Sequence, residues 1–169
     1  MRAPPGCQSG ATLFEIAVMF AVLSVLGVFL LEGIAYVQEA GEKTAEEQQA
    51  AAFELGVQLE AASRMAGGRE YEIPSLAGEN PARWLESSPQ NYLGEFRDRP
   101  PKGAKRASWF YDAERGELVY LVSRSEHFRS GPGGEKEIRL HVVVDPPQRI
   151  NNRSIARVSL RPAREYAWF

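Results

Sequence analysis

The feature that most constrains this chain is an uninterrupted apolar run near its N-terminus. Residues 11–31 read ATLFEIAVMFAVLSVLGVFLL and contain one ionisable side chain, that of Glu15. An α-helix rises about 1.5 Å per residue, so a helix over this run is roughly 30 Å long, which matches the hydrocarbon core of a bilayer. A core helix of a soluble protein carries a polar stripe, and this run has none. The run therefore predicts a single membrane-spanning helix.

The residues on either side of the run predict its orientation. Arg2 precedes it, whereas the segment after it is acidic, with five glutamates against Lys43 between residues 32 and 47. Positive charge is retained in the cytoplasm, so we expect a cytoplasmic N-terminus and an external C-terminal part. A cleaved secretory signal is the alternative. Its apolar stretch is shorter, roughly 7–15 residues, and ends at a small-residue cleavage site, whereas this run continues directly into helix-forming sequence.

Glu15 is the second unusual feature, because it lies five residues into the apolar run. A carboxylate costs about 2.5–3.5 kcal/mol at the centre of a membrane helix and less toward the interface. Such a residue indicates a function and a partner. No Lys or Arg lies within one helical turn of Glu15. We therefore expect the partner to come from another chain or from a chain terminus.

The segment QSGATLFE, from Gln8 to Glu15 and followed at once by the apolar helix, resembles the class III signal of type IV pilin-like proteins. These proteins include pilins, minor pilins and the pseudopilins of type II secretion systems. The resemblance implies that a prepilin peptidase cuts between Gly10 and Ala11 on the cytoplasmic side and methylates the new amino terminus. It also implies that Glu15 is an assembly carboxylate, which meets the terminal amine of a neighbouring subunit.

Two positions differ from the usual pattern of that family. Ala11 stands where Phe is usual, and Glu32 lies in the region where many members carry a helix-kinking Pro. Without that Pro, the helix is expected to be straighter.

Beyond the run, the pattern predicts a helix to residue 66, ended by Gly67-Gly68. Glu39 and Lys43 are spaced for a favourable ion pair. One stripe of residues recurs at three- and four-residue steps: Val37, Gly41, Thr44, Gln48, Ala52, Leu55, Leu59, Ala62 and Ala66. We expect one continuous helix of about 55 residues, roughly 80 Å long. The alternative is an anchor joined to a separate helix by a break near Gly33 or Gly41.

The remaining residues predict a small α+β domain. Asn80 is expected to cap a short helix that starts at Pro81, and Gly116 to adopt a left-handed conformation in a hairpin turn. Alternating patterns predict four strands, at residues 108–112, 117–123, 138–144 and 156–160. Pro146-Pro147 is expected to end the third strand. An antiparallel sheet wrapped against the lower half of the long helix is the natural assembly.

This organisation matches a pilin-like α+β fold, in which a long N-terminal helix, membrane-spanning in its first half, packs on a small antiparallel β-sheet. The expected parts are a cleaved leader at 1–10, the transmembrane half of the helix at 11–31, its periplasmic half at 32–68 and a periplasmic head domain at 69–169.

The composition of the 169 residues gives little sign of chemistry. A single Cys, Cys7, excludes a disulfide scaffold, and the net charge of −2 gives no footprint for nucleic acid. His127 and His141 are expected to be solvated. The late acidic residues are too scattered for a calcium site: Glu135, Glu137, Asp145 and Glu165. An aromatic group is expected in the core: Trp84, Tyr92, Trp109, Phe110 and Tyr111. We expect no catalytic residue, cofactor or metal.

These observations favour a structural subunit over an enzyme. The first hypothesis is a pseudopilin of a type II protein secretion system, a single-pass protein of the bacterial inner membrane with its head domain in the periplasm. Its expected partners are the prepilin peptidase, other pilin or pseudopilin subunits, the inner-membrane assembly platform and the lipid bilayer, with no nucleic acid. The alternatives are a minor subunit of a type IV pilus, serving adhesion, motility or DNA uptake, and an unpolymerised, membrane-anchored periplasmic binding domain.

Overall fold

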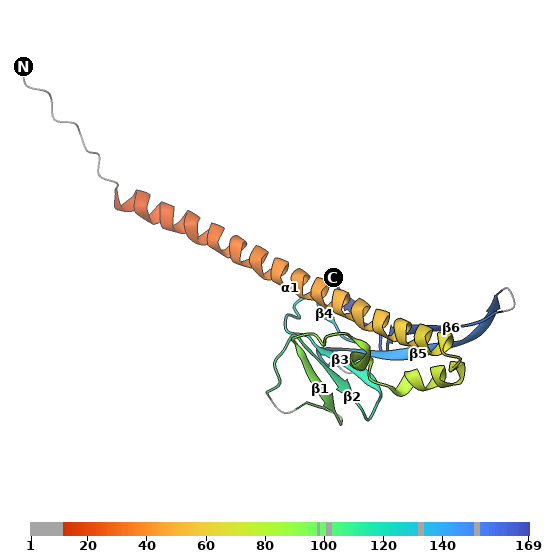
Figure 1. The fold of residues 1–169 in the computed structure, drawn as a ribbon. Helices are drawn as coiled ribbons and strands as arrows, with labels where there is room; N and C mark the ends of the chain where they lie inside the picture. The colour runs from red at the N-terminus through yellow and green to blue at the C-terminus, as the bar shows by residue number, and fades with distance from the viewer. Residues whose placement is uncertain (1–11, 98, 101–102, 132–133, 151–152) are drawn as a thin grey trace, which may run out of the picture. The chain divides into compact units, whose positions relative to one another are not determined.

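The structure, a computed structural model, describes residues 12–97, 99–100, 103–131, 134–150 and 153–169. The chain divides into two compact units, one that ends at Gln38 and one that comprises Glu39–Phe169. The elements are α1 (Leu13–Ala66), the 3-10 helices η1 (Glu70–Gly78) and η2 (Pro81–Trp84), and the strands β1 (Tyr92–Phe96), β2 (Ser108–Asp112), β3 (Glu117–Leu121), β4 (Phe128–Arg129), β5 (Glu137–Ile150), β6 (Arg153–Pro162) and β7 (Ala167–Trp168). Helix α1 and strands β1 to β6 are labelled in Figure 1.

Helix α1 is continuous from Leu13 to Ala66, so the alternative of a break near Gly33 or Gly41 is wrong. A glycine inside a helix costs only about 1 kcal/mol, which the remaining residues of so long a helix offset. The predicted C-terminal end of this helix, at residue 66, is confirmed. Gly68 has a φ of +69°, and the backbone N–H of the next residue, Arg69, donates to a carbonyl in the last turn (2.8 Å).

The first unit consists of the apolar half of α1. Among the described residues, α1 is the one helix that is long and apolar enough to cross a membrane. Its most apolar 18-residue window is entirely unburied by the protein itself. Phe14, Leu30 and Leu31 are 66–77 % exposed. Large apolar side chains exposed in such a row indicate a surface that is covered by lipid or by another chain.

The second unit is built on a five-stranded sheet of order β1-β2-β3-β5-β6, with a separate two-stranded ribbon of β4 and β7. Strand β1 runs parallel to β2, and the other pairs are antiparallel. The sheet is therefore mixed, and the prediction of an antiparallel sheet is wrong. Strand β1 is not among the four predicted strands, and its five residues include Gly94 at a φ of +109°. Parallel neighbours need a crossover connection in place of a tight turn, and residues 97–107 connect β1 to β2.

Strand β5 passes through Pro146-Pro147 and ends at Ile150, so the predicted end of this strand is wrong. The register between β5 and β6 shifts between Asp145 and Gln148, which marks an irregularity at the two prolines. A proline has no backbone N–H and so cannot donate a hydrogen bond to the neighbouring strand. At a bulge the residue is unpaired in any case, so a proline is tolerated there. The predicted β2–β3 hairpin is confirmed, with Gly116 at a φ of +66°.

The core of the second unit lies between the sheet and the segment of α1 that begins at Glu39. Phe53 meets Trp109 edge-on, with 5.3 Å between the ring centroids. Farther along α1, Val57 packs with Ile73 of η1 and Val142 of β5. Burying each such side chain contributes about 1.5–3 kcal/mol. The expected aromatic core is confirmed, since three of the five rings are buried and two are half-buried: Trp109, Phe110 and Tyr111, then Trp84 and Tyr92.

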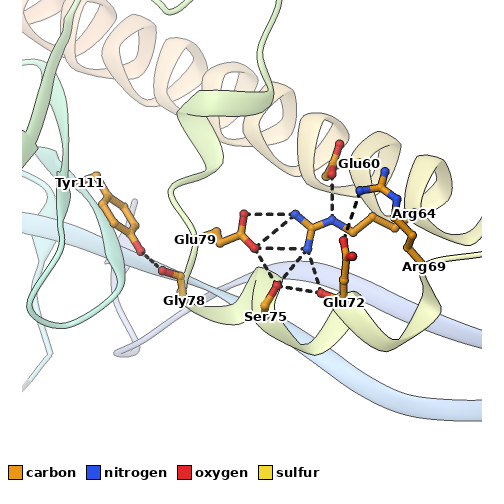
Figure 2. Close-up of polar contacts among 8 residues, drawn as sticks. All are labelled: Glu60, Arg64, Arg69, Glu72, Ser75, Gly78, Glu79 and Tyr111. Carbon is orange, nitrogen blue, oxygen red and sulfur yellow. Dashed lines mark hydrogen bonds and ion pairs between the residues drawn. The ribbon is translucent and has the colours of Figure 1, made fainter. Parts of the chain in front are cut away.

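Arg64, in the last turn of α1, ties the helix to η1 (Figure 2). Its buried guanidinium donates to both carboxylate oxygens of Glu79 (3.1–3.2 Å), to the Glu60 carboxylate (2.8 Å) and to the Ser75 hydroxyl (3.0 Å). A further bond to the carbonyl oxygen of Glu72 (2.8 Å) completes the set. These bonds hold the pKa of Glu79 below its usual range. Arg64 therefore holds η1 and the residue that follows it, Glu79, against the last turn of α1.

Replacing Arg64 with Ala is expected to lower the free energy of unfolding by about 1.5–3 kcal/mol, because it removes a buried guanidinium and its charged hydrogen bonds to Glu79, which is itself 33 % exposed. Arg69→Ala is the matched control: Arg69 pairs with Glu72 (3.2 Å) at the surface, and its loss is expected to cost no more than about 1 kcal/mol. Denaturant unfolding of the full chain in detergent micelles, followed by tryptophan fluorescence, measures both. Equal losses in the two variants would contradict this role for Arg64.

Candidate functional site

The predicted processing site falls outside the described part of the chain. Gly10 and Ala11 both lie before residue 12, so cleavage and methylation there stay predictions. Glu15 is described, in the first turn of α1.

Glu15 forms a reciprocal capping box with Thr12. The Glu15 carboxylate accepts from the backbone N–H of Thr12 (2.8 Å), and the backbone N–H of Glu15 donates to the Thr12 hydroxyl (3.3 Å). A Thr followed three residues later by Glu is the sequence signature of this motif, which satisfies two N–H groups at a helix start. Glu15 thus has hydrogen-bond partners in its own chain, but both are neutral, and the expected cationic partner from another chain or a chain terminus stays a prediction. Its negative charge is not compensated by them.

Three further glutamates of α1 are buried in the second unit. Glu39, Glu42 and Glu46 are 1 %, 8 % and 2 % exposed and lie on the face of α1 that also carries Phe53. The predicted pair of Glu39 with Lys43 is wrong, since Lys43 lies 3.8 Å from Glu47 instead.

Glu39 holds the ribbon of β4 and β7 against α1. Its carboxylate accepts from the backbone N–H of His127 (2.9 Å), bonds the Nδ1 of the same residue (2.8 Å) and accepts from the indole N–H of Trp168 (3.1 Å). Burial alone would raise the pKa of Glu39, but these bonds outweigh it and hold the pKa below its usual range. His127 was expected to be an unremarkable solvated residue. It is exposed as expected, but it is not unremarkable, because its ring is held by the buried Glu39 carboxylate.

Glu42 binds the chain where it leaves β3. Its carboxylate accepts from the backbone N–H groups of Ser123 (2.6 Å) and Arg124 (2.9 Å) and from the hydroxyl of Tyr120 (3.3 Å). Two consecutive N–H groups directed at one carboxylate form an anion-binding turn. Glu39 and Glu42 thus fix this loop and the C-terminal ribbon on α1.

Glu46 is buried without such donors, since no hydrogen bond reaches its carboxyl group from any residue that the structure describes. Burial raises the pKa of Glu46 to about 7, the Glu47 carboxylate adds to the effect, and the Lys43 ammonium opposes it. Burial, together with the charges of Glu46 and Glu47, raises the pKa of Tyr166 to about 12. The position thus holds a carboxyl group that is protonated over much of the acidic range.

The opposite face of α1 carries the stripe that the sequence predicted. Within the second unit all of its members are exposed and none is charged: Gly41, Thr44, Gln48, Ala52, Leu55, Leu59, Ala62 and Ala66. Leu55 and Leu59 are 56 % and 61 % exposed. The stripe was expected on a helix wrapped by the sheet, yet the sheet covers the face of Glu39, Phe53 and Val57. In the sequence, the covered face could have been recognised from Phe53 and Val57, which are four residues apart. Glu39, Glu42 and Glu46 lie on the same face toward the N-terminus of the helix.

The other candidates give no second site. His141 is half-buried on β5, and its Nδ1 has no hydrogen-bond partner among the described residues. No group of three or more His, Cys, Asp or Glu side chains placed to hold a metal ion occurs in the described part of the chain.

Comparison of the chain with protein-family models, with curated proteins and with solved structures gives no match. The functional inference therefore rests on the chain's own residues: Glu15, the apolar half of α1 and the exposed uncharged stripe.

The burial of Glu46 predicts a pH dependence of stability. The unfolded chain loses this proton near pH 4.3, the folded chain near pH 7, so stability falls as the pH rises between these values and then levels off. Glu46→Gln removes the ionisation. The variant is expected to gain up to about 3 kcal/mol relative to the parent protein between pH 4 and pH 8. Glu86→Gln is the control, because Glu86 is exposed and is not among the charges that shift the pKa of Glu46. Thermal unfolding of the full chain across this pH range measures the difference, and a pH-independent difference for Glu46→Gln contradicts the prediction.

Proposed function

We propose that this chain is a structural subunit of a periplasmic pseudopilus of a type II protein secretion system. In this proposal it is anchored in the bacterial inner membrane by residues 11–31, clipped after Gly10 and assembled through its N-terminal helix. The observation that carries the proposal is the pair of opposite faces on α1: one face is committed to the sheet, and the other is exposed and free of charge from Gly41 to Ala66.

A solvent-facing side of a helix ordinarily carries charged residues. Here the charged residues of α1 lie on the buried face or beside the stripe, as Glu46 and Glu47 do. Small residues such as Gly41 and Ala52 let a second helix approach closely, and Leu55 and Leu59 offer apolar side chains to it. Lateral packing of identical or related helices in a fibre accounts for this composition.

Glu15 supports the same proposal. Its hydrogen bonds to Thr12 come from neutral donors, so they leave a full negative charge in the apolar run. A cationic terminal amine of a neighbouring subunit is the counter-charge that the assembly would supply. An anchor that never polymerises has no need of this carboxylate beyond its capping role.

Two substitutions separate charge pairing from capping. Glu15→Gln retains the capping box, in which Gln replaces Glu, but removes the charge, whereas Glu15→Ala removes both. We expect both variants to insert into the membrane and both to lose incorporation into fibres at least about tenfold. The measurement is the amount of the chain in sheared, sedimented pseudopili of cells that overproduce the assembly. Normal incorporation of Glu15→Gln would show that the residue is a helix cap and no more.

The exposed stripe gives an independent prediction. Leu55→Arg and Leu59→Arg each place a charge on the uncharged face, where an adjacent helix would have to bury it, and we expect incorporation to fall at least about tenfold. Folding is expected to be unaffected, because both side chains are more than half exposed. Leu93→Arg is the matched control, since Leu93 is 36 % exposed on β1. If the two α1 variants assemble as well as the control, the stripe is not an assembly surface.

A further inference from the structure

The second unit contains an open cavity that the proposed function does not use. It has a volume of about 320 Å³ and lies where β3 ends at Leu121 and β5 begins at Glu137, beside the connection between β1 and β2. Its size is at the lower end of the range of ligand-binding pockets.

The cavity lies in the most basic part of the chain. Residues 97–106 contain five basic and one acidic residue, although the whole chain has a net charge of −2. Arg99, Arg106 and Lys136 are exposed and line the cavity. Its two acidic lining residues are already paired, because Glu135 forms an ion pair with Arg99 and Glu137 accepts from the buried Arg139 (2.6 Å).

Two of these cations are available to a ligand. One guanidinium nitrogen of Arg106 donates to the carbonyl oxygen of Val122 (3.1 Å), which anchors the group and leaves its other N–H groups without a hydrogen-bond partner among the described residues. Lys136 is also available, because its ammonium group makes no ion pair with any residue that the structure describes. An anchored guanidinium recognises planar or tetrahedral oxyanions with little loss of side-chain freedom.

We propose that this cavity binds a multivalent oxyanion, a phosphate- or carboxylate-bearing ligand, through Arg106 and Lys136. The Arg99–Glu135 pair borders the site, and the Glu135 carboxylate opposes the entry of an anion. The inference goes beyond the proposed function, because binding in the cavity needs neither cleavage nor assembly.

Isothermal titration of the full chain in uncharged detergent micelles at low ionic strength tests the proposal, with pyrophosphate and citrate as separate probes. We expect one ligand per chain, and the tighter of the two probes identifies the preferred acid group. Arg106→Gln and Lys136→Gln are each expected to weaken binding at least about tenfold, because each removes a charged hydrogen-bond donor. Glu135→Gln is expected to strengthen it, because it removes a competing negative charge.

Arg115→Gln is the matched control. Arg115 is exposed in the turn between β2 and β3, outside the cavity lining, and its replacement changes the net charge by the same amount. It is expected to change affinity less than about twofold. Absence of binding by either probe, or equal losses in Arg115→Gln and Arg106→Gln, would overturn the proposal, since diffuse attraction to a charged surface depends on net charge alone. Unchanged unfolding temperatures of the free variants exclude misfolding as the cause of a loss.

Discussion

The second unit depends on a single constraint: one helix covers the inner face of its sheet. From Glu39 to Ala66 that helix contacts the rest of the unit through a stripe that changes in character along its length. Carboxylates bind backbone N–H groups at one end, Phe53 and Val57 fill the core in the middle, and Arg64 is ion-paired at the other end. The apolar middle contributes most of the stabilisation. Buried charges at the two ends contribute little net free energy, but they are costly in any other register and thereby fix where the helix lies along the sheet.

The parts of this fold that the sequence predicted correctly are those whose determinants are local. The end of α1 follows from Gly67-Gly68, the cap of η2 from Asn80, whose side chain accepts from the Ala82 N–H (3.0 Å), and the β2–β3 turn from Gly116. The parts it missed depend on distant residues. A glutamate in a helical sequence ordinarily points to solvent, and the donors that bury Glu39 lie 88 and 129 residues away. The parallel position of β1 likewise depends on where a loop returns the chain, and no local pattern encodes this.

The candidate site divides in the same way. Sequence alone singles out Glu15, because a carboxylate in an apolar run is costly wherever it occurs. It also finds the stripe from Gly41 to Ala66 as a periodic pattern. It does not tell which face of the helix the sheet covers, because two apolar patterns of similar period, one through Leu55 and one through Phe53, run along the same helix. The larger aromatic side chain lies on the covered face, where burial of its greater apolar area favours folding most.

The composition of the exposed face limits what it can do by itself. Gly41, Thr44, Gln48 and Ala52 bury little apolar area, and two leucines add about 1.5–3 kcal/mol each when they are fully covered. That gain is comparable to the loss of translational and rotational freedom on association, which is about 4–15 kcal/mol, so this face does not hold two free heads together in water. In the proposed fibre, the membrane confines and aligns the apolar helices before they meet. Most of the translational and rotational freedom is therefore lost before the subunits associate. The exposed face then discriminates against neighbouring helices that carry a charge at the point of contact, because that charge would be buried without a counter-charge.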